Sequence, residues 1–294
     1  MRSLEFGAPD YQIAAPAKIN VGLKVLNRRL DGYHEIWTIL HQIDLHDRLL
    51  MWEDPDFSFC VTTDLPDIPE DESNLCVKAA RLLRRVTGCA KGVRLRLEKN
   101  IPSGAGLGGG SSDAAAALLG LNHLWQLNLS RGRLLELAAS LGSDVPFFIL
   151  GGVCVGAGRG EILTPVDQQI EDPIVLVCPD VHVSTAWAYK NIENYRLTNI
   201  IESIIFVDSL PQNIFSEPVI ETLSNDFERV VFKRHPTLSN IKGLLNDFGA
   251  YYASMSGSGS SLYGIFKTRE KAQTAAAKLE SFGRVFLTGK SHPS

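Results

Sequence analysis

The spacing of apolar and polar residues predicts a chain built from short strands and helices. Alternating or continuous apolar runs predict strands at residues 11–15, 18–26, 93–97, 154–155, 174–178, 251–253, 261–266 and 284–287. Helical spacing, or a helix-forming run between capping residues, predicts helices at residues 75–86, 114–125, 130–141, 219–231, 238–248 and 269–282. Because the strands and helices do not alternate strictly, the pattern favours an α+β fold.

A polar, proline-flanked stretch from Glu161 to Asp172 interrupts this pattern. The chain has 294 residues, enough for one large domain or two ordinary ones. We place a boundary in the polar stretch and predict one domain over residues 1–163 and a second over residues 164–294.

Composition limits the classes of protein to consider. The apolar content of 45% and charged content of 21% are ordinary for a globular protein, and the net charge of −4 offers no basic field for nucleic acid or an anionic membrane. The five cysteines are widely spaced and form no C-x-x-C pair, which favours a reducing compartment. Residues 1–10 lack the apolar core of a secretion signal, and the longest apolar run, residues 145–158, is too short to cross a bilayer. We therefore expect a cytoplasmic monomer or homodimer without nucleic-acid or membrane partners.

Residues 99–115 carry the strongest chemical signal of the chain. Five glycines lie within seven positions, at Gly104, Gly106, Gly108, Gly109 and Gly110. The following Ser111–Ser112–Asp113 offers helix N-caps, and an alanine-rich, helix-forming run comes next. A glycine loop that leads into a helix presents unpaired N–H groups and the positive end of the helix dipole, so this stretch predicts a phosphate site.

Several kinds of phosphate loop are known, and most of them do not fit. Gly104, Gly106 and Gly109 satisfy the G-x-G-x-x-G pattern of dinucleotide-binding proteins, but residues 122–129 lack the acidic residue expected about 20 positions later. No lysine follows the glycines as in a Walker A loop, and the H-R-D motif of protein kinases is missing from the sequence. A flexible linker is disfavoured by the strand predicted before the loop and the helix predicted after it.

The pattern P-x-x-x-G-L-G-x-x-S-S at residues 102–112 instead resembles the second motif of the GHMP kinases, which phosphorylate small molecules. That resemblance predicts two further motifs. One is present as Pro-Ala-Lys-Ile-Asn-Val-Gly-Leu at residues 16–23, and the other as Ser-Met-Ser-Gly-Ser-Gly-Ser-Ser at residues 254–261. It implies a ribosomal-protein-S5-like ATP-binding domain followed by a ferredoxin-like α/β sandwich domain.

Four segments narrow the resemblance to the branch of the family that phosphorylates 4-diphosphocytidyl-2-C-methyl-D-erythritol in the non-mevalonate route to isopentenyl diphosphate. They are residues 31–35, 108–113, 142–148 and 225–228. The likeness covers nearly the whole chain and is weakest over residues 52–70 and 191–217. A homoserine- or mevalonate-type kinase is the main alternative, although those acceptors have no base for an Asp-Gly-Tyr-His loop to recognise. An inactive nucleotide-binding regulator is the other.

Phosphoryl transfer to an alcohol needs alignment, charge neutralisation and an acceptor for the hydroxyl proton. Asp144 precedes an apolar run, so its carboxylate is either a candidate base or a structural cap or ion pair. Lys18 lies among apolar residues on a predicted strand, where it is either paired or on an exposed face. The resemblance implies that Asp144 and Lys18 are both catalytic residues. Asn20 shares the strand face of Lys18 and is expected to face the acceptor.

The resemblance also implies which residues bind ATP. The residues expected at its phosphates are Pro102, Ser103, Gly104, Ala105, Gly106, Leu107, Gly108, Gly109, Gly110, Ser111 and Ser112. Asn74 and Lys99 are weaker candidates for adenosine contacts. Mg²⁺ is expected with ATP, and Ser111 or Ser112 could supply a hydroxyl to it, but the sequence indicates no carboxylate ligand.

For the acceptor, the resemblance implies that Tyr33 stacks on the cytosine ring and that His34 hydrogen-bonds it, whereas the local sequence alone also fits a hairpin tip. Tyr189 matches the position of a second stacking aromatic, with core packing as the alternative. Thr185 is expected to face the diphosphate. Gly257 and Ser258 belong to the third motif, which is expected to pack beside the phosphate loop and shape the site.

Overall fold

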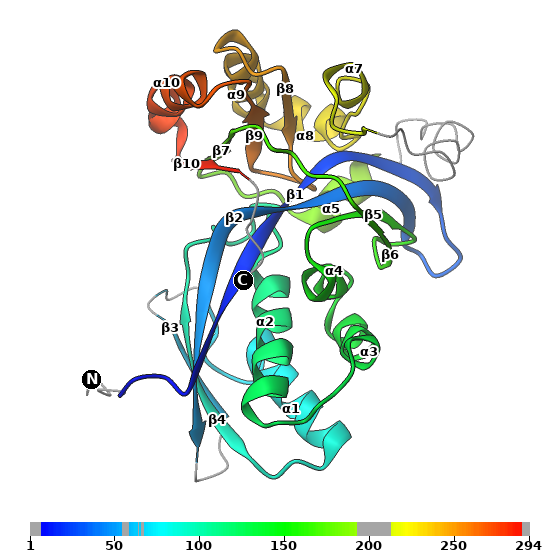
Figure 1. Cartoon of the computed structure of the whole chain (residues 1–294). Helices are drawn as coiled ribbons and strands as arrows, with labels where there is room; N and C mark the ends of the chain where they lie inside the picture. The colour runs from blue at the N-terminus through cyan, green and yellow to red at the C-terminus, as the bar shows by residue number, and fades with distance from the viewer. Residues whose placement is uncertain (1–6, 55–58, 64, 66–67, 193–212, 290–294) are drawn as a thin grey trace.

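The computed structural model describes residues 7–54, 59–63, 65, 68–192 and 213–289, arranged around two sheets (Figure 1). The first sheet has the strand order β3-β4-β2-β5-β6, and β1 pairs with β2 beside this path. Its strands are β1 (Tyr11–Arg28), β2 (His34–Asp54), β3 (Phe59–Thr63), β4 (Gly92–Glu98), β5 (Val153–Ala157) and β6 (Ile162–Val166). Its helices are α1 (Leu75–Thr87), α2 (Gly109–Leu124), α3 (Arg131–Leu141) and α4 (Val145–Leu150).

The second sheet has the order β10-β7-β9-β8. Its strands are β7 (Ile174–Cys178), β8 (Tyr252–Met255), β9 (Leu262–Ile265) and β10 (Arg284–Thr288). The helices of this part are α5 (Thr185–Ile192), α7 (Glu217–Ile220), α8 (Glu228–Arg234), α9 (Pro236–Asp247) and α10 (Arg269–Leu279), followed by a 3₁₀ turn at Glu280–Phe282. In both parts of the chain, strands and helices follow one another without strict alternation, so the expected α+β class and two-part architecture are confirmed.

Three apolar clusters hold the layers together. One lies between the first sheet and helices α1 to α4, where Leu49, Met51 and Leu118 are fully buried. The second lies between the two sheets, and the third lies between the second sheet and its helices. Strand β7 serves both of the latter, because Leu176 faces the cluster between the sheets and Val177 faces the helices. A strand buried on both faces reads as a continuous apolar run, which is how the sequence predicts it.

The two longest strands differ most from expectation. The segments predicted at residues 11–15 and 18–26 form one continuous strand, β1, whose pairing with β2 shifts register between Pro16 and Ala17. Proline donates no ladder hydrogen bond and is tolerated in strands at such irregularities, so it marks a bulge here instead of a strand end. The sequence predicted no strand over β2. Both strands run from the helices of the first part to the second sheet (Figure 1).

Local capping signals place most helices correctly. Asn74 caps α1 by accepting from Cys76 N, and Ser130 caps α3 by accepting from Arg133 N. The single helix expected over residues 219–231 is instead two short helices, α7 and α8. The chain leaves the helix between them because Asn225 pairs with Leu23 of β1 in an isolated bridge.

The change from the first sheet to the second comes after the predicted boundary. The boundary between residues 163 and 164 falls inside β6, which pairs with β5 of the first sheet. The next strand, β7, begins the second sheet at Ile174. Within the described residues, no helix has the length and apolar character needed to cross a membrane. Residues 193–212, within the stretch where the family resemblance is weakest, lie outside the described part.

Candidate active site

The glycine loop leads into helix α2 as expected, but the helix begins earlier than predicted. Gly108 is its N-cap in the left-handed conformation, with φ of 72°, and no side chain caps the first turn. The expected capping residues, Ser111 to Asp113, lie inside the helix. Left-handed backbone is accessible to glycine at little cost, which allows this early start. The first backbone N–H groups of α2 therefore point into the loop with the positive end of the dipole.

Close contacts fix the loop against two other motifs of the sequence. Lys18 N of β1 donates to Leu107 O over 3.0 Å. A Cβ on Gly106 would lie 2.2 Å from Ser256 O, and one on Gly108 would lie 2.8 Å from Phe148 Cζ. Only glycine fits at these two positions. The loop lines a cavity of about 430 Å³ that also includes Asn74 and Lys99.

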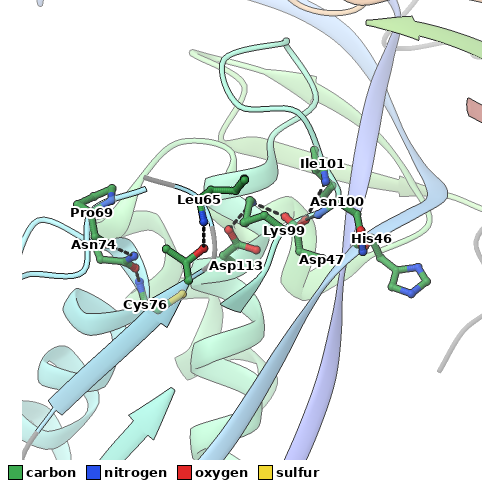
Figure 2. A network of polar contacts seen from close by, with 11 residues as sticks. His46, Asp47, Leu65, Pro69, Asn74, Cys76, Lys99, Asn100, Ile101 and Asp113 are labelled. Atoms are coloured by element: carbon green, nitrogen blue, oxygen red, sulfur yellow. Dashed lines mark hydrogen bonds and ion pairs between the residues drawn. The ribbon is translucent and has the colours of Figure 1, made fainter. Parts of the chain in front are cut away.

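Both candidates for adenosine contacts reach this cavity, but their polar groups bind other parts of the protein (Figure 2). Lys99 Nζ bonds to Asp47 Oδ2 and, over 2.7 Å, to Asp113 Oδ2. Asn74 Nδ2 donates to Pro69 O over 2.7 Å, while its oxygen caps α1. Contacts of these two residues with adenosine remain a prediction, and what the structure gives them is a framework role.

The same network holds the entrance of the loop. Asp47 Oδ1 accepts from Asn100 N over 2.5 Å and from Ile101 N over 2.8 Å (Figure 2). Burial raises the pKa of Asp113 to about 7, although the Lys99 ammonium opposes this rise. Lys99 therefore ties the start of the loop, through Asp47, to the helix that follows it, through Asp113.

A second cavity, of about 190 Å³, brings the predicted catalytic residues together. Nine predicted residues line it: Lys18, Asn20, Gly106, Gly108, Asp144, Thr185, Tyr189, Gly257 and Ser258. Lys18 is 5% exposed, and its Nζ donates to Asn20 Oδ1 over 2.6 Å. Burial lowers the pKa of Lys18, and the negative charge of Asp144 raises it in opposition. Thr185 and Ser258 share a hydrogen bond of 2.8 Å between their hydroxyl oxygens.

A third cavity, of about 650 Å³, contains the predicted aromatic residues Tyr33, His34 and Tyr189. The rings of His34 and Tyr189 are stacked, with centroids 5.4 Å apart and an interplanar angle of 18°. Tyr33 is 58% exposed at the end of the turn between β1 and β2. The structure thus brings residues from both predicted domains to one aromatic cavity.

Sequence reasoning missed the positively charged residues of the third cavity. Arg159 lines both the second and the third cavity, and its guanidinium carbon lies 5.0 Å from the centre of the Tyr33 ring. Arg28 and Lys190 also line the third cavity. Arg159 lies between Gly158 and Gly160, at the end of a second glycine-rich stretch. That stretch was the available signal, but its neighbour in space, Tyr33, is more than a hundred positions away in the sequence.

The three cavities adjoin in a row. The first and second share Gly106 and Gly108, and the second and third share Arg159 and Tyr189. The row therefore runs from the phosphate loop, past Lys18 and Asp144, to the aromatic residues. A larger cavity of about 910 Å³ lies at the ends of α1 and α3, and the residues described as lining it include none of the predicted site residues.

Comparison with known proteins identifies the family to which this fold belongs. Residues 74–152 match the GHMP kinases N terminal domain, and residues 216–285 match the GHMP kinases C terminal domain. A homoserine kinase from Cytophaga hutchinsonii has the same fold, with a TM-score of 0.68 at 20% identity over 98% of each chain.

More similar proteins define the branch of the family. A protein of Chlorobium chlorochromatii named 4-diphosphocytidyl-2-C-methyl-D-erythritol kinase is 41% identical over 94% of this chain and 96% of its own length. A similarly named relative from Prosthecochloris aestuarii is 40% identical over 96% of this chain and 98% of its own length. A crystal structure of 4-(cytidine 5'-diphospho)-2C-methyl-D-erythritol kinase superposes with a TM-score of 0.77 at 35% identity, covering 96% of this chain and 100% of that one. The chain therefore belongs to the 4-diphosphocytidyl-2-C-methyl-D-erythritol kinase family of the GHMP kinases.

Proposed function

We propose that this protein transfers the γ-phosphoryl group of ATP to the 2-hydroxyl of 4-diphosphocytidyl-2-C-methyl-D-erythritol, a step of the non-mevalonate pathway to isopentenyl diphosphate. The observation that carries the proposal is the row of three cavities with shared walls. A donor at the phosphate loop and an acceptor at the aromatic residues would meet beside Lys18 and Asp144. The names of the relatives support the same acceptor.

At the donor end, we assign the triphosphate of ATP to the glycine loop. Backbone N–H groups at the start of α2 and the helix dipole favour an anion there. Glycines at positions 106 and 108 let the backbone approach the phosphates without side chains in between.

The transfer step follows from the residues of the second cavity. The acceptor oxygen attacks the γ-phosphorus. The bond between the γ-phosphorus and the oxygen that bridges it to the β-phosphorus breaks, and ADP leaves. We assign acceptance of the hydroxyl proton to Asp144, and we assign to Lys18, the buried cation of the same cavity, the role of balancing the charge of the phosphates and of Asp144. Asn20 orients Lys18 through its side-chain oxygen.

Mg²⁺ is part of this proposal, since it neutralises charge on the phosphates of bound ATP. Such an ion takes one or two protein oxygens and completes its coordination with phosphates and water. This fits a site in which no cluster of three or more acidic, histidine or cysteine ligands occurs among the described residues. Ser112 Oγ is buried in α2 without a hydrogen-bond partner in the described part of the chain, so it is one oxygen available near the loop.

At the acceptor end, we assign the cytosine to the rings of Tyr33, His34 and Tyr189, and the diphosphate to the cations beside them. Arg28, Arg159 and Lys190 give the third cavity a positive lining suited to two phosphates. Homoserine and mevalonate have neither a nucleobase nor a diphosphate, so this cavity favours the cytidine-containing acceptor over these two. The cytoplasm remains the expected compartment. Cys76, Cys89, Cys154 and Cys178 are free thiols.

An ADP-coupled assay with three acceptors side by side tests the proposal. The cytidine diphosphate sugar alcohol, homoserine and mevalonate are each supplied with ATP and Mg²⁺. We expect turnover with the first alone. Turnover with homoserine or mevalonate at a comparable kcat/KM would show that the acceptor assignment is wrong. If no ADP forms with any of the three acceptors, the result would favour an inactive nucleotide-binding protein.

A further inference from the structure

The motif Asn225-Asp226-Phe227-Glu228 follows α7 and ends at the first residue of α8, and the chemistry described so far gives its asparagine no role. Asn225 is 2% exposed. Its Nδ2 donates to Met255 O and to Gly257 O, both over 2.7 Å. Its Oδ1 accepts from Phe227 N over 3.0 Å. All three hydrogen bonds of this carboxamide are therefore made to backbone groups around the active site.

Strands β8 and β9 and the turn that joins them, residues 256–261, form a hairpin, and this turn is in contact with both the phosphate loop and strand β1. Ser256 Oγ donates to Gly106 O over 2.9 Å and accepts from Asn20 N over 3.3 Å. Ser256 O also packs so closely on Gly106 that no Cβ would fit between them. A shift of the hairpin must therefore move the loop, Asn20, or both.

The rest of the motif ties the same segment to its surroundings. Asp226 Oδ2 accepts from Val25 N of β1 over 3.0 Å, and Glu228 Oε1 accepts from Met255 N of β8 over 2.9 Å. The Phe227 ring meets Tyr189 edge-on, with centroids 4.8 Å apart. The motif therefore connects β1, which carries Lys18, with β8, which leads into the hairpin.

We propose that Asn225 is a positioning residue for phosphate transfer, which holds the Gly257 carbonyl and through this hairpin aligns the phosphate loop with Asn20. The kinetic part of this inference rests on the proposed function. An asparagine side chain supplies two N–H donors and an acceptor oxygen, which are the groups required here. An aspartate has the same shape but would place an oxygen against two carbonyl oxygens.

Asn225→Asp tests the proposal, with Asn122→Asp as the matched control. Asn122 also ties backbone by its side chain, to Leu129 N and Leu129 O, but it lies about 20 Å along α2 from the loop. Both variants are compared with the wild type at a temperature where circular dichroism shows each to be folded. We measure the Kd of a non-hydrolysable ATP analogue by calorimetry, and kcat and KM for both substrates.

We expect Asn225→Asp to raise the Kd of the analogue about fivefold to tenfold, as for one or two lost hydrogen bonds, and to lower kcat at least tenfold. Asn122→Asp should lower Tm but leave Kd and kcat within about twofold. Equal effects of the two variants on Kd and kcat would overturn the proposal, because a merely structural amide would explain both. If Asn225→Asp does not fold, Asn225→Ser is measured with the same expectations, since serine retains one donor.

A double-mutant cycle tests the route through the hairpin. Ser256→Ala removes the hydroxyl that touches Gly106 and Asn20, so its effect on the analogue Kd should be less than multiplicative with that of Asn225→Ser. Independent, multiplicative effects would overturn this route. The calorimetric measurements need no acceptor, so they decide the inference even if the wild type does not phosphorylate the proposed acceptor.

Discussion

Lys18 Nζ donates a hydrogen bond to Asn20 Oδ1 over 2.6 Å, and this contact orients the buried cation of the site. Asn20 cannot turn its amide easily, because its Nδ2 donates to Thr38 Oγ1 over 2.9 Å and Thr38 Oγ1 donates to Gly22 O over 2.8 Å. A chain of three hydrogen bonds thus directs an oxygen, and not an N–H, at the ammonium. Because Asn20 is neutral, the positive charge of Lys18 is left to interact with Asp144 and with a bound phosphate.

Replacing Asp144 with asparagine keeps the shape of the side chain but removes its proton acceptor and its charge. General-base catalysis typically contributes about 10²- to 10⁴-fold, so we expect kcat to fall at least about 100-fold. ATP affinity should change little, because the nucleotide is assigned to the glycine loop. Steady-state kinetics and calorimetry measure the two effects, and a kcat within a few-fold of the wild type would remove Asp144 from the transfer step.

Gly108→Val should abolish ATP binding. Gly108 has φ of 72°, and a Cβ there would lie 2.8 Å from Phe148 Cζ and 3.2 Å from Lys18 Cε. This conformation is unfavourable for a β-branched residue, whose side chain would also push on Lys18. Calorimetry should detect no ATP binding while far-ultraviolet circular dichroism stays native-like. Gly132→Val, at a glycine in α3 where a Cβ would meet only Ser130 Oγ at 4.0 Å, is the control, and normal ATP binding by Gly108→Val would contradict the assignment of the loop.

Local signals made part of the fold predictable. Helices α1 and α3 follow directly from a capping residue, an apolar pattern and a terminal glycine, so a few neighbouring residues determine each of them. The start of α2 could not be placed in this way. Gly108 adopts its left-handed conformation where it packs against Lys18 and Phe148, which are distant in the sequence.

Strand β2 and Arg159 were missed for the same reason. Along β2, Ile39 faces the cluster between the sheets while Leu40 and Leu49 face the helices of the first part. Its apolar residues therefore serve two cores, and no simple alternation results. The motifs identified Lys18, Asn20 and Asp144, but the position of Arg159 over Tyr33 depends on how the sheet folds.

Tyr33 distinguishes recognition of a base from other roles of this loop. Stacking a base on an aromatic ring contributes about 1–3 kcal/mol in single-stranded nucleic-acid complexes, which corresponds to roughly 5- to 150-fold in affinity. We expect Tyr33→Ala to raise the acceptor KM within that range and Tyr33→Phe to change it little, since the ring is retained. Kinetics with each substrate varied in turn test this. A higher KM for ATP with an unchanged acceptor KM would mean that the loop serves adenine.

Lys99 should matter for stability more than a comparable surface lysine. Its side chain is 3% exposed and lies between Asp47 and Asp113, so its removal leaves two buried carboxylates without their cation. Breaking such buried pairs typically costs about 3–5 kcal/mol. We expect Lys99→Met to lower the free energy of unfolding by about that amount in denaturant titrations. Lys91→Met, which breaks an exposed pair with Glu53, should cost about 1 kcal/mol or less, and equal losses would argue against the network.

His41 should make stability depend on pH between neutrality and acid. It is buried in β2, where its Nε2 accepts from Ile170 N over 2.9 Å, and burial lowers its pKa from 6.5 to about 4. Between these values the unfolded chain binds a proton that the folded chain does not. The stabilisation from neutral His41 is therefore fully present above about pH 6.5 and is lost as pH falls toward 4, by about 3 kcal/mol in total.

Urea unfolding of the wild type and of His41→Gln at pH 7, 6, 5 and 4 isolates this contribution, because glutamine can accept from Ile170 N but does not titrate. Other groups titrate equally in both proteins, so the difference between the two unfolding free energies carries the histidine term. We expect the wild type to lose stability relative to the variant at each step below pH 6.5. Parallel curves would show that the pKa of His41 is unchanged on folding, and that its burial beside Ile170 does not oppose its charged form.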